Sequence, residues 1–173
     1  MSSDHMVNKR TAYISAVLVT AAIIILYLLI PYLYFQGTPA PVLGNGPVGN
    51  FPIGRISIDN SSYNVYVAAN QEMQQLGYMN ATGIGNCDGL NSCAGMLFIF
   101  NNESRECFWM KNTLIALKQS WISYDKVNYT YLGTPLSTGI VCSPGSMVLE
   151  TLPDFPINVS DTVSFLGAYN RSL

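Results

Sequence analysis

The residues best suited to chemistry form one short run, Phe108-Trp109-Met110-Lys111-Asn112-Thr113. A lysine and an asparagine follow large apolar residues directly, where a buried strand would continue with apolar side chains. An aromatic ring beside an ammonium and an amide suits a small polar ligand such as a sugar or a carboxylate. The candidate ligand-binding residues are therefore Trp109, Met110, Lys111, Asn112 and Thr113, with Glu150 as an additional carboxylate.

A structural interpretation of the same residues stays open. In it, Trp109 fills the core, Lys111 pairs with Glu150, and Asn112 caps a turn. Catalysis has little support, because the single histidine lies near the N-terminus and no Gly-x-Ser-x-Gly elbow is present. The sequence predicts no catalytic residue, cofactor or metal. An enzyme that acts on exterior glycans or lipids through Lys111, Asn112 and Glu150 is the least favoured hypothesis.

Several segments resemble a known family, the widespread bacterial and archaeal proteins called domain of unknown function 192. The run Phe-Trp-Met-Lys-Asn-Thr is the most specific of them, and the resemblance covers about residues 54–167. The other matching segments are Gly95–Phe100, Leu136–Thr138, Ser143–Gly145 and Val148–Glu150. The resemblance implies a mostly antiparallel β fold and, because the family has no assigned activity, no biochemical function.

The chain departs from the family pattern in two places. The short helix of the family usually ends Gly-Leu-Met, whereas this chain has Leu76-Gly77-Tyr78-Met79. Family members usually carry an acidic residue after Ile-Pro-Leu, whereas this chain places Lys118 after Ile115-Ala116-Leu117. The reversed sign puts an acid–base role at that position in doubt.

Alternation of apolar and polar residues predicts mainly β structure beyond residue 54. Residues 55–59 and 63–67 are expected to form a hairpin, and 115–124 and 127–132 a second one. A helix is expected over 70–79, with Asn70 as N-cap and Gly77 at its end. The two apolar runs that flank Asn101–Glu106 are expected to be separate strands joined by a turn. Gly133–Pro144 is expected to be irregular, followed by strands over 147–152 and 162–166. About eight strands and one short helix favour an antiparallel β barrel or sandwich.

Residues 12–35 carry no charged side chain and are long enough to span a bilayer as a helix. Lys9 and Arg10 precede this span, and no further basic residue occurs before Arg55, so residues 1–11 are expected in the cytoplasm and the rest outside. The predicted organisation is a cytoplasmic tail at 1–11, a single transmembrane helix at 12–35, a Gly/Pro-rich linker at 36–54 and an exterior β-domain at 55–173. The apolar residues of the linker leave an extended segment packed along the domain as an alternative.

Six Asn-x-Ser/Thr acceptor sites all lie beyond the span. They predict an exported glycoprotein domain with a low-charge exterior, similar to archaeal surface proteins. The candidate glycosylation sites are Asn60, Asn80, Asn102, Asn128, Asn158 and Asn170.

All four cysteines also lie in the exterior part. An oxidising compartment favours the disulfides Cys87–Cys93 and Cys107–Cys142, with free thiols as the alternative and a zinc site disfavoured by the spacing. Methionines 73, 79, 96, 110 and 147 offer soft ligands for copper(I), but their apolar sequence positions favour core packing.

The exterior part has six basic and nine acidic residues, a net charge of −3 that argues against nucleic-acid binding. The expected partners are the lipid bilayer, another membrane protein or complex, and a small polar ligand. The favoured function is a membrane-anchored extracytoplasmic binding or accessory domain. The alternative is a pilin-like surface protein whose leader is cut after Arg10, leaving the apolar helix for assembly.

Overall fold

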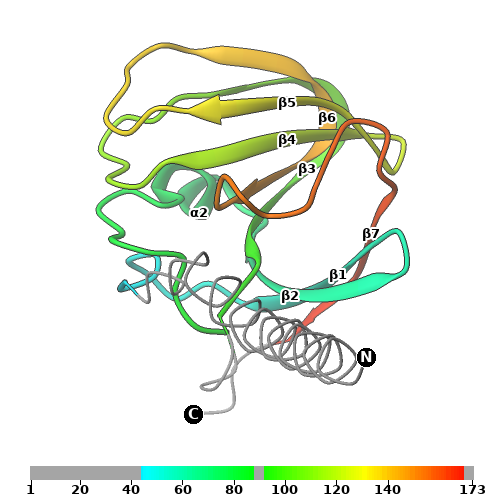
Figure 1. Ribbon diagram of the computed structural model, residues 1–173, viewed down its shortest axis with the longest axis horizontal. Coiled ribbons are helices and arrows are strands. Elements are labelled where there is room, and N and C mark those ends of the chain that lie inside the picture. Colours follow the sequence, from blue (N-terminus) through cyan, green and yellow to red (C-terminus); the bar gives the residue numbers. More distant parts are fainter. Residues whose placement is uncertain (1–43, 88–91, 170–173) are drawn as a thin grey trace, which may run out of the picture. The chain divides into compact units, whose positions relative to one another are not determined.

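The computed structural model describes residues 44–87 and 92–169. They form one curled, half-barrel sheet of seven strands in the order β5-β4-β6-β3-β2-β1-β7, with one short helix, α2 (Figure 1). The elements are β1 (Ile53–Ile58), β2 (Ser61–Ala68), α2 (Gln71–Leu76), β3 (Gly95–Phe108), β4 (Leu117–Ser123), β5 (Lys126–Gly133), β6 (Val141–Thr151) and β7 (Val163–Tyr169). The fold is therefore mainly β, as the alternation predicted.

The predicted tail and transmembrane helix, residues 1–35, lie outside the described residues. Across 44–87 and 92–169, no helix is both long enough and apolar enough to cross a membrane.

Two hairpins and the helix agree with the sequence prediction. β1 pairs antiparallel with β2, and β4 pairs antiparallel with β5. Tyr124 and Asp125 make the second turn with positive φ angles of 50° and 61°. The side chain of Asn70 accepts a hydrogen bond from the backbone N–H of Met73 at 2.9 Å, which caps α2. Gly77, at φ 47°, ends the helix.

The predicted turn at Asn101–Glu106 is wrong. This polar run lies inside β3, and both halves of β3 pair antiparallel with the same strand, β6. Ile99 opposes Met147 and Ser104 opposes Gly145, so the chain between them forms a wide bulge instead of reversing direction. The run contains neither glycine nor proline. Its polar side chains are exposed to water within the strand, which does not require the chain to reverse direction.

The start of β6 also differs from the prediction. Residues 141–144, expected to be irregular, form its first part and pair with the second half of β3. The described strands number seven instead of about eight, because the two apolar runs belong to one strand. One strand pair, β2 with β3, is parallel. Residues 69–94, which include α2, make the connection that this pair requires.

The sheet buries a hydrophobic cluster on each face. On one face, α2 packs Met73 and Leu76 against a cluster that includes Phe98, Trp121 and Val148. The cluster on the other face is made by Ile56, Ile58, Val65, Val67, Leu97, Ile122, Val127, Met147, Leu149, Ile157 and Val163. Of the five exterior methionines, Met96, Met110 and Met147 are buried and Met73 packs against the core.

Residues 152–162 link β6 to β7 and bring the two edges of the sheet together. The backbone N–H of Val127 in β5 donates to the carbonyl of Asp161 at 3.0 Å, and Ser160 donates to the Val127 carbonyl at 2.8 Å. Lys118 donates from Nζ to the carbonyl of Phe155 at 2.6 Å. The lysine that replaces the acidic residue of the family pattern therefore fixes this connection.

Residues 44–54, the described end of the predicted linker, pack along the domain. The backbone N–H of Asn45 donates to Oγ1 of Thr82 at 3.0 Å, and the Asn45 carbonyl accepts from the N–H of Thr82 at 3.1 Å. Phe51 is buried, and β1 begins at Ile53. Phe51 and Ile53 thus pack into the core, whereas Val48 is 57% exposed. Over residues 44–54 the structure agrees with the alternative of an extended segment packed along the domain.

Both favoured disulfides are present. Cys87 and Cys93 close a short loop, with their Cα atoms 5.0 Å apart. Cys107 and Cys142 face each other across β3 and β6, with their Cα atoms 4.1 Å apart. The second pair therefore joins neighbouring strands of the sheet, whereas the first closes a loop outside the named strands.

Candidate functional site

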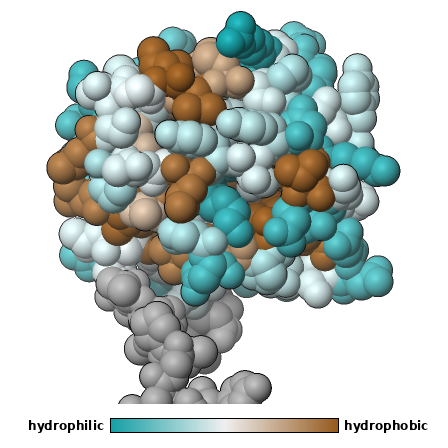
Figure 2. Space-filling model, turned by 45° about the horizontal axis from the view of Figure 1, so that its top comes forward, coloured by the Kyte–Doolittle hydropathy of each residue, from teal (hydrophilic) through white to brown (hydrophobic). Residues whose placement is uncertain are grey.

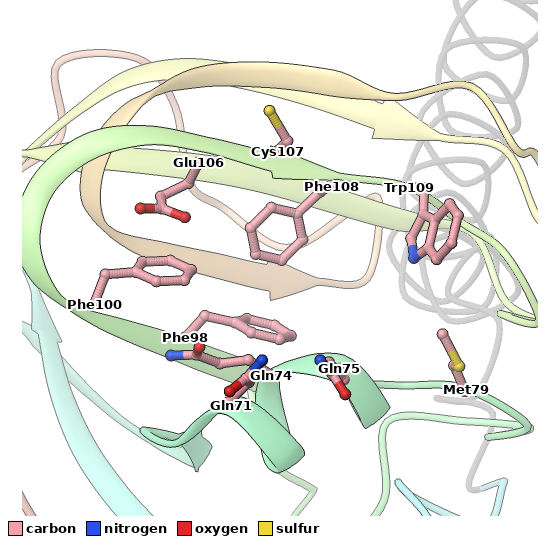
Figure 3. A pocket seen from close by; sticks show the side chains of 10 residues that line it. All are labelled: Gln71, Gln74, Gln75, Met79, Phe98, Phe100, Glu106, Cys107, Phe108 and Trp109. Carbon is pink, nitrogen blue, oxygen red and sulfur yellow. The ribbon is translucent and has the colours of Figure 1, made fainter.

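A groove with a volume of about 470 Å³ lies between α2 and the two halves of β3. In Figure 3, the rings of Phe100 and Phe108 lie across from the glutamines of α2, and Phe98 lies between them, beside Gln74. The full lining is Gln71, Gln74, Gln75, Met79, Phe98, Phe100, Glu106, Cys107, Phe108 and Trp109. Aromatic faces opposite amide groups form an amphipathic surface for a ligand.

The bend in β3 positions the aromatic rings. Phe108, in the second half, meets Phe98 of the first half edge to face, with 4.9 Å between ring centroids. Behind it, Phe108 contacts the buried Trp121 of β4 at 5.8 Å. These edge-to-face contacts hold the ring of Phe108 between the groove lining and the core.

A smaller pocket of about 40 Å³ opens from the groove, since six residues line both spaces. Its own lining adds Leu76, Gly77, Tyr78, Lys111, Thr113 and Glu150. The inner pocket therefore combines the end of α2, the run after Phe108 and the strand β6.

Glu150 is the buried acidic group in the lining of this inner pocket. It lies on β6 between Met96 of β3 and Gln119 of β4 and is 4% exposed. The amide Nε2 of Gln119 donates to its Oε1 at 2.9 Å. Burial raises the pKa of Glu150 from 4.5 to about 7, against the opposing effect of that hydrogen bond. The carboxyl group therefore changes charge near neutral pH.

Tyr78 is the second buried titratable group in the pocket. Its hydroxyl donates to the carbonyl of Ile84 at 3.4 Å. Burial, and then the negative charge of Glu150, raises the pKa of Tyr78 well above its ordinary value. Tyr78 therefore stays neutral, and Glu150 is the group that titrates.

The structure brings four of the six sequence candidates to these cavities. Trp109 lines both, and Lys111, Thr113 and Glu150 line the inner one. Met110 is buried beside Gln119, and Asn112 lies in an exposed turn at φ 58°, where its carbonyl accepts from the N–H of Asn80 at 2.8 Å. These two residues shape the run but line neither cavity.

Of the structural interpretation of this run, only the turn at Asn112 is present. Trp109 is 43% exposed, and Trp121 fills the core instead. The ammonium of Lys111 lies 5.0 Å from the centroid of the Trp109 ring. Among the described residues, no ion pair joins Lys111 to Glu150.

Sequence reasoning missed Gln119, Tyr78 and the glutamines of α2. Gln119 had a readable signal, because it is the one polar residue in the inward-facing series Leu117, Gln119 and Trp121. A polar side chain at a core position of a strand needs a buried partner, which here is Glu150. The glutamines carried no such signal, since they also suit any exposed helix.

Of the six predicted glycosylation sites, five lie in the described residues, and the asparagine is exposed in each. Asn170 lies outside them. On the face in Figure 2, exposed hydrophobic side chains form separate groups divided by polar ones, so that face presents no continuous apolar surface.

Two solved structures share this fold. One is a protein of unknown function from Novosphingobium aromaticivorans, with a TM-score of 0.58 and 23% identity, covering 73% of this chain and 94% of that one. The other, from Sinorhizobium meliloti, is provisionally described as a transcription regulator; its TM-score is 0.56 at 20% identity, covering 68% of this chain and 96% of that one. No curated protein matches the chain. The family profile described as Uncharacterized ACR matches residues 55–155. The chain therefore belongs to the domain of unknown function 192 (DUF192) family.

Proposed function

We propose that this protein is a membrane-anchored binding domain on the outer side of the cell membrane, and that its groove takes a carbohydrate. One observation carries the proposal: the rings of β3 face the amides of α2 across about 470 Å³ of open space. Sugar rings offer apolar C–H faces that pack on aromatic rings and hydroxyl groups that pair with amides. An accessory subunit of a membrane complex would use such a groove to hold a glycan near its partner.

Three further observations support the location. The uncharged segment 12–35 has the length of a membrane span. Both disulfides require an oxidising compartment to persist. Five acceptor asparagines are exposed and accessible to a glycosylating enzyme.

Tryptophan fluorescence tests the groove directly, because the chain has two tryptophans in contrasting places. Trp109 lines the groove, whereas Trp121 is fully buried. The full chain in detergent micelles, titrated with cellohexaose, laminarihexaose and mannohexaose, is expected to show a saturable change with at least one of them. The Trp109→Phe variant should lose that change, and Leu114→Ala, exposed and outside both linings, should keep it. A folded protein that responds to none of these glycans would overturn the proposal.

The location is tested on protein in native membranes. Protease added from outside should remove residues beyond 54, and peptide mass spectrometry should find glycans on the exposed asparagines and an intact N-terminus. A mature chain that starts at Thr11 in polymers would replace this proposal with the pilin-like alternative.

A further inference from the structure

The inner pocket has room for one small chemical group. A volume of about 40 Å³ exceeds the 10–15 Å³ that a single water needs, but it does not admit a sugar ring. Because Phe98, Phe108 and Trp109 line both spaces, a ligand in the groove can extend a substituent into it. The question is which substituent the pocket fits.

The pocket offers one strong hydrogen-bond acceptor. Gln119 occupies Oε1 of Glu150, and among the described residues the second carboxyl oxygen accepts no hydrogen bond. The hydroxyl of Tyr78 donates elsewhere, to Ile84. When ionised, this buried carboxylate has no cationic partner within residues 44–87 and 92–169. A buried charge is stabilised best by an opposite charge within hydrogen-bond distance.

The walls also suit a cation. Phe98, Phe108 and Trp109 line the pocket, and the face of an aromatic ring attracts positive charge. Lys111 demonstrates this at the rim, because its own ammonium lies over the Trp109 ring. A carboxylate ligand would meet Glu150 and suffer repulsion as soon as both were ionised.

We infer that the inner pocket is a subsite for a protonated primary amino group on the ligand, with Glu150 as its acceptor and the aromatic rings as its walls. The inference rests on the proposed function and deepens it: the ligand class becomes an amine-bearing sugar. Lys111 stands at the rim and competes with the incoming cation for the same rings.

Binding of an amine should therefore depend on pH. Ionisation of Glu150 near pH 7 creates the partner for the ligand. The other titratable or charged groups that line the two cavities are Tyr78, Lys111 and Glu106. Tyr78 stays neutral in this range, and Glu106 lines only the outer groove. An alkyl ammonium, like that of lysine, stays protonated between pH 5.5 and 8.

Methyl 6-amino-6-deoxyglucoside and methyl glucoside are a matched pair of probes, measured by calorimetry with the full chain in micelles. At pH 8 the amino sugar is expected to bind about tenfold or more tightly than its neutral partner, as a charge-assisted contact implies. At pH 5.5 the preference should fall to about twofold. Glu150→Gln should abolish the preference at pH 8. Glu106→Gln should keep it, and Lys111→Met should strengthen it.

The outcomes distinguish failure of the amine subsite from failure of the proposed carbohydrate binding. Glycan binding with no amine preference, or a preference that persists in a folded Glu150→Gln variant, overturns the subsite and leaves the carbohydrate function standing. Butylammonium that binds with the same dependence on Glu150 and pH, while no sugar binds, supports the subsite and overturns the carbohydrate function. Absence of binding by any probe to the folded protein overturns both.

Discussion

Replacing Glu150 by glutamine should make the protein more stable at high pH. The amide keeps the shape of the side chain and can still pair with Gln119, but it removes a buried group that ionises. Burial raises the pKa of Glu150 from 4.5 in the unfolded chain to about 7 in the fold. That difference corresponds to about 3 kcal/mol in the free energy of unfolding.

The direction of the pH effect follows from the protonation of Glu150 in the folded and unfolded states. Between pH 4.5 and about 7 the folded protein keeps the proton on Glu150 and the unfolded chain has lost it, so the wild type loses stability as pH rises through this window. Above pH 7 both states are ionised and the loss is complete. The glutamine variant has no such loss. Its advantage over wild type should therefore be small near pH 4.5 and reach about 3 kcal/mol at pH 8.

Thermal unfolding followed by near-ultraviolet circular dichroism at pH 5, 6, 7 and 8 measures this advantage. For a domain of this size, about 3 kcal/mol corresponds to roughly 10 °C in Tm. The other acidic groups are common to both proteins and cancel in the difference. Glu103→Gln, an exposed position in the bulge of β3, should give a pH-independent difference near zero. A Glu150→Gln advantage that stays constant from pH 5 to 8 would refute the reasoning.

Three further changes test the fold. Gly95→Ala should lower the free energy of unfolding by about 2–4 kcal/mol in urea titrations, because its methyl group would overlap the Glu150 carbonyl; a loss below 1 kcal/mol would contradict the close approach of β3 and β6. Replacing the Cys107–Cys142 pair by serines should lower the free energy of unfolding by about 4 kcal/mol, and replacing the Cys87–Cys93 pair by about 2 kcal/mol, because the first pair closes the longer loop. Calorimetry that finds the reverse order would reject this entropic account. Asn70→Ala should lower the free energy of unfolding by about 1 kcal/mol, because it removes the N-cap of α2, whereas Asn70→Asp should keep the cap and the stability. Urea unfolding measures both variants.

Local sequence features were sufficient to predict part of this structure. Asn70 and Gly77 delimit α2 through backbone requirements that hold in any surroundings. The turn at Tyr124 and Asp125 joins two strands that are neighbours in the chain, so their pairing needs no distant segment. Spacing and location favoured the two disulfides, with free thiols as the alternative, and the structure decided between them.

The sequence by itself therefore determined the two hairpins and the helix with its caps, and it favoured the cysteine pairs that the structure confirms. Only the tertiary structure decided that Asn101–Glu106 continues a strand, because a polar run suits a turn and an exposed bulge equally, and β6 selects between them. It also decided the site. Glu150 and Gln119 are separated by 31 positions, and they meet because β4 and β6 pair in one register. The burial that raises the pKa of Glu150 comes from α2 and β3 together, and no local pattern records it.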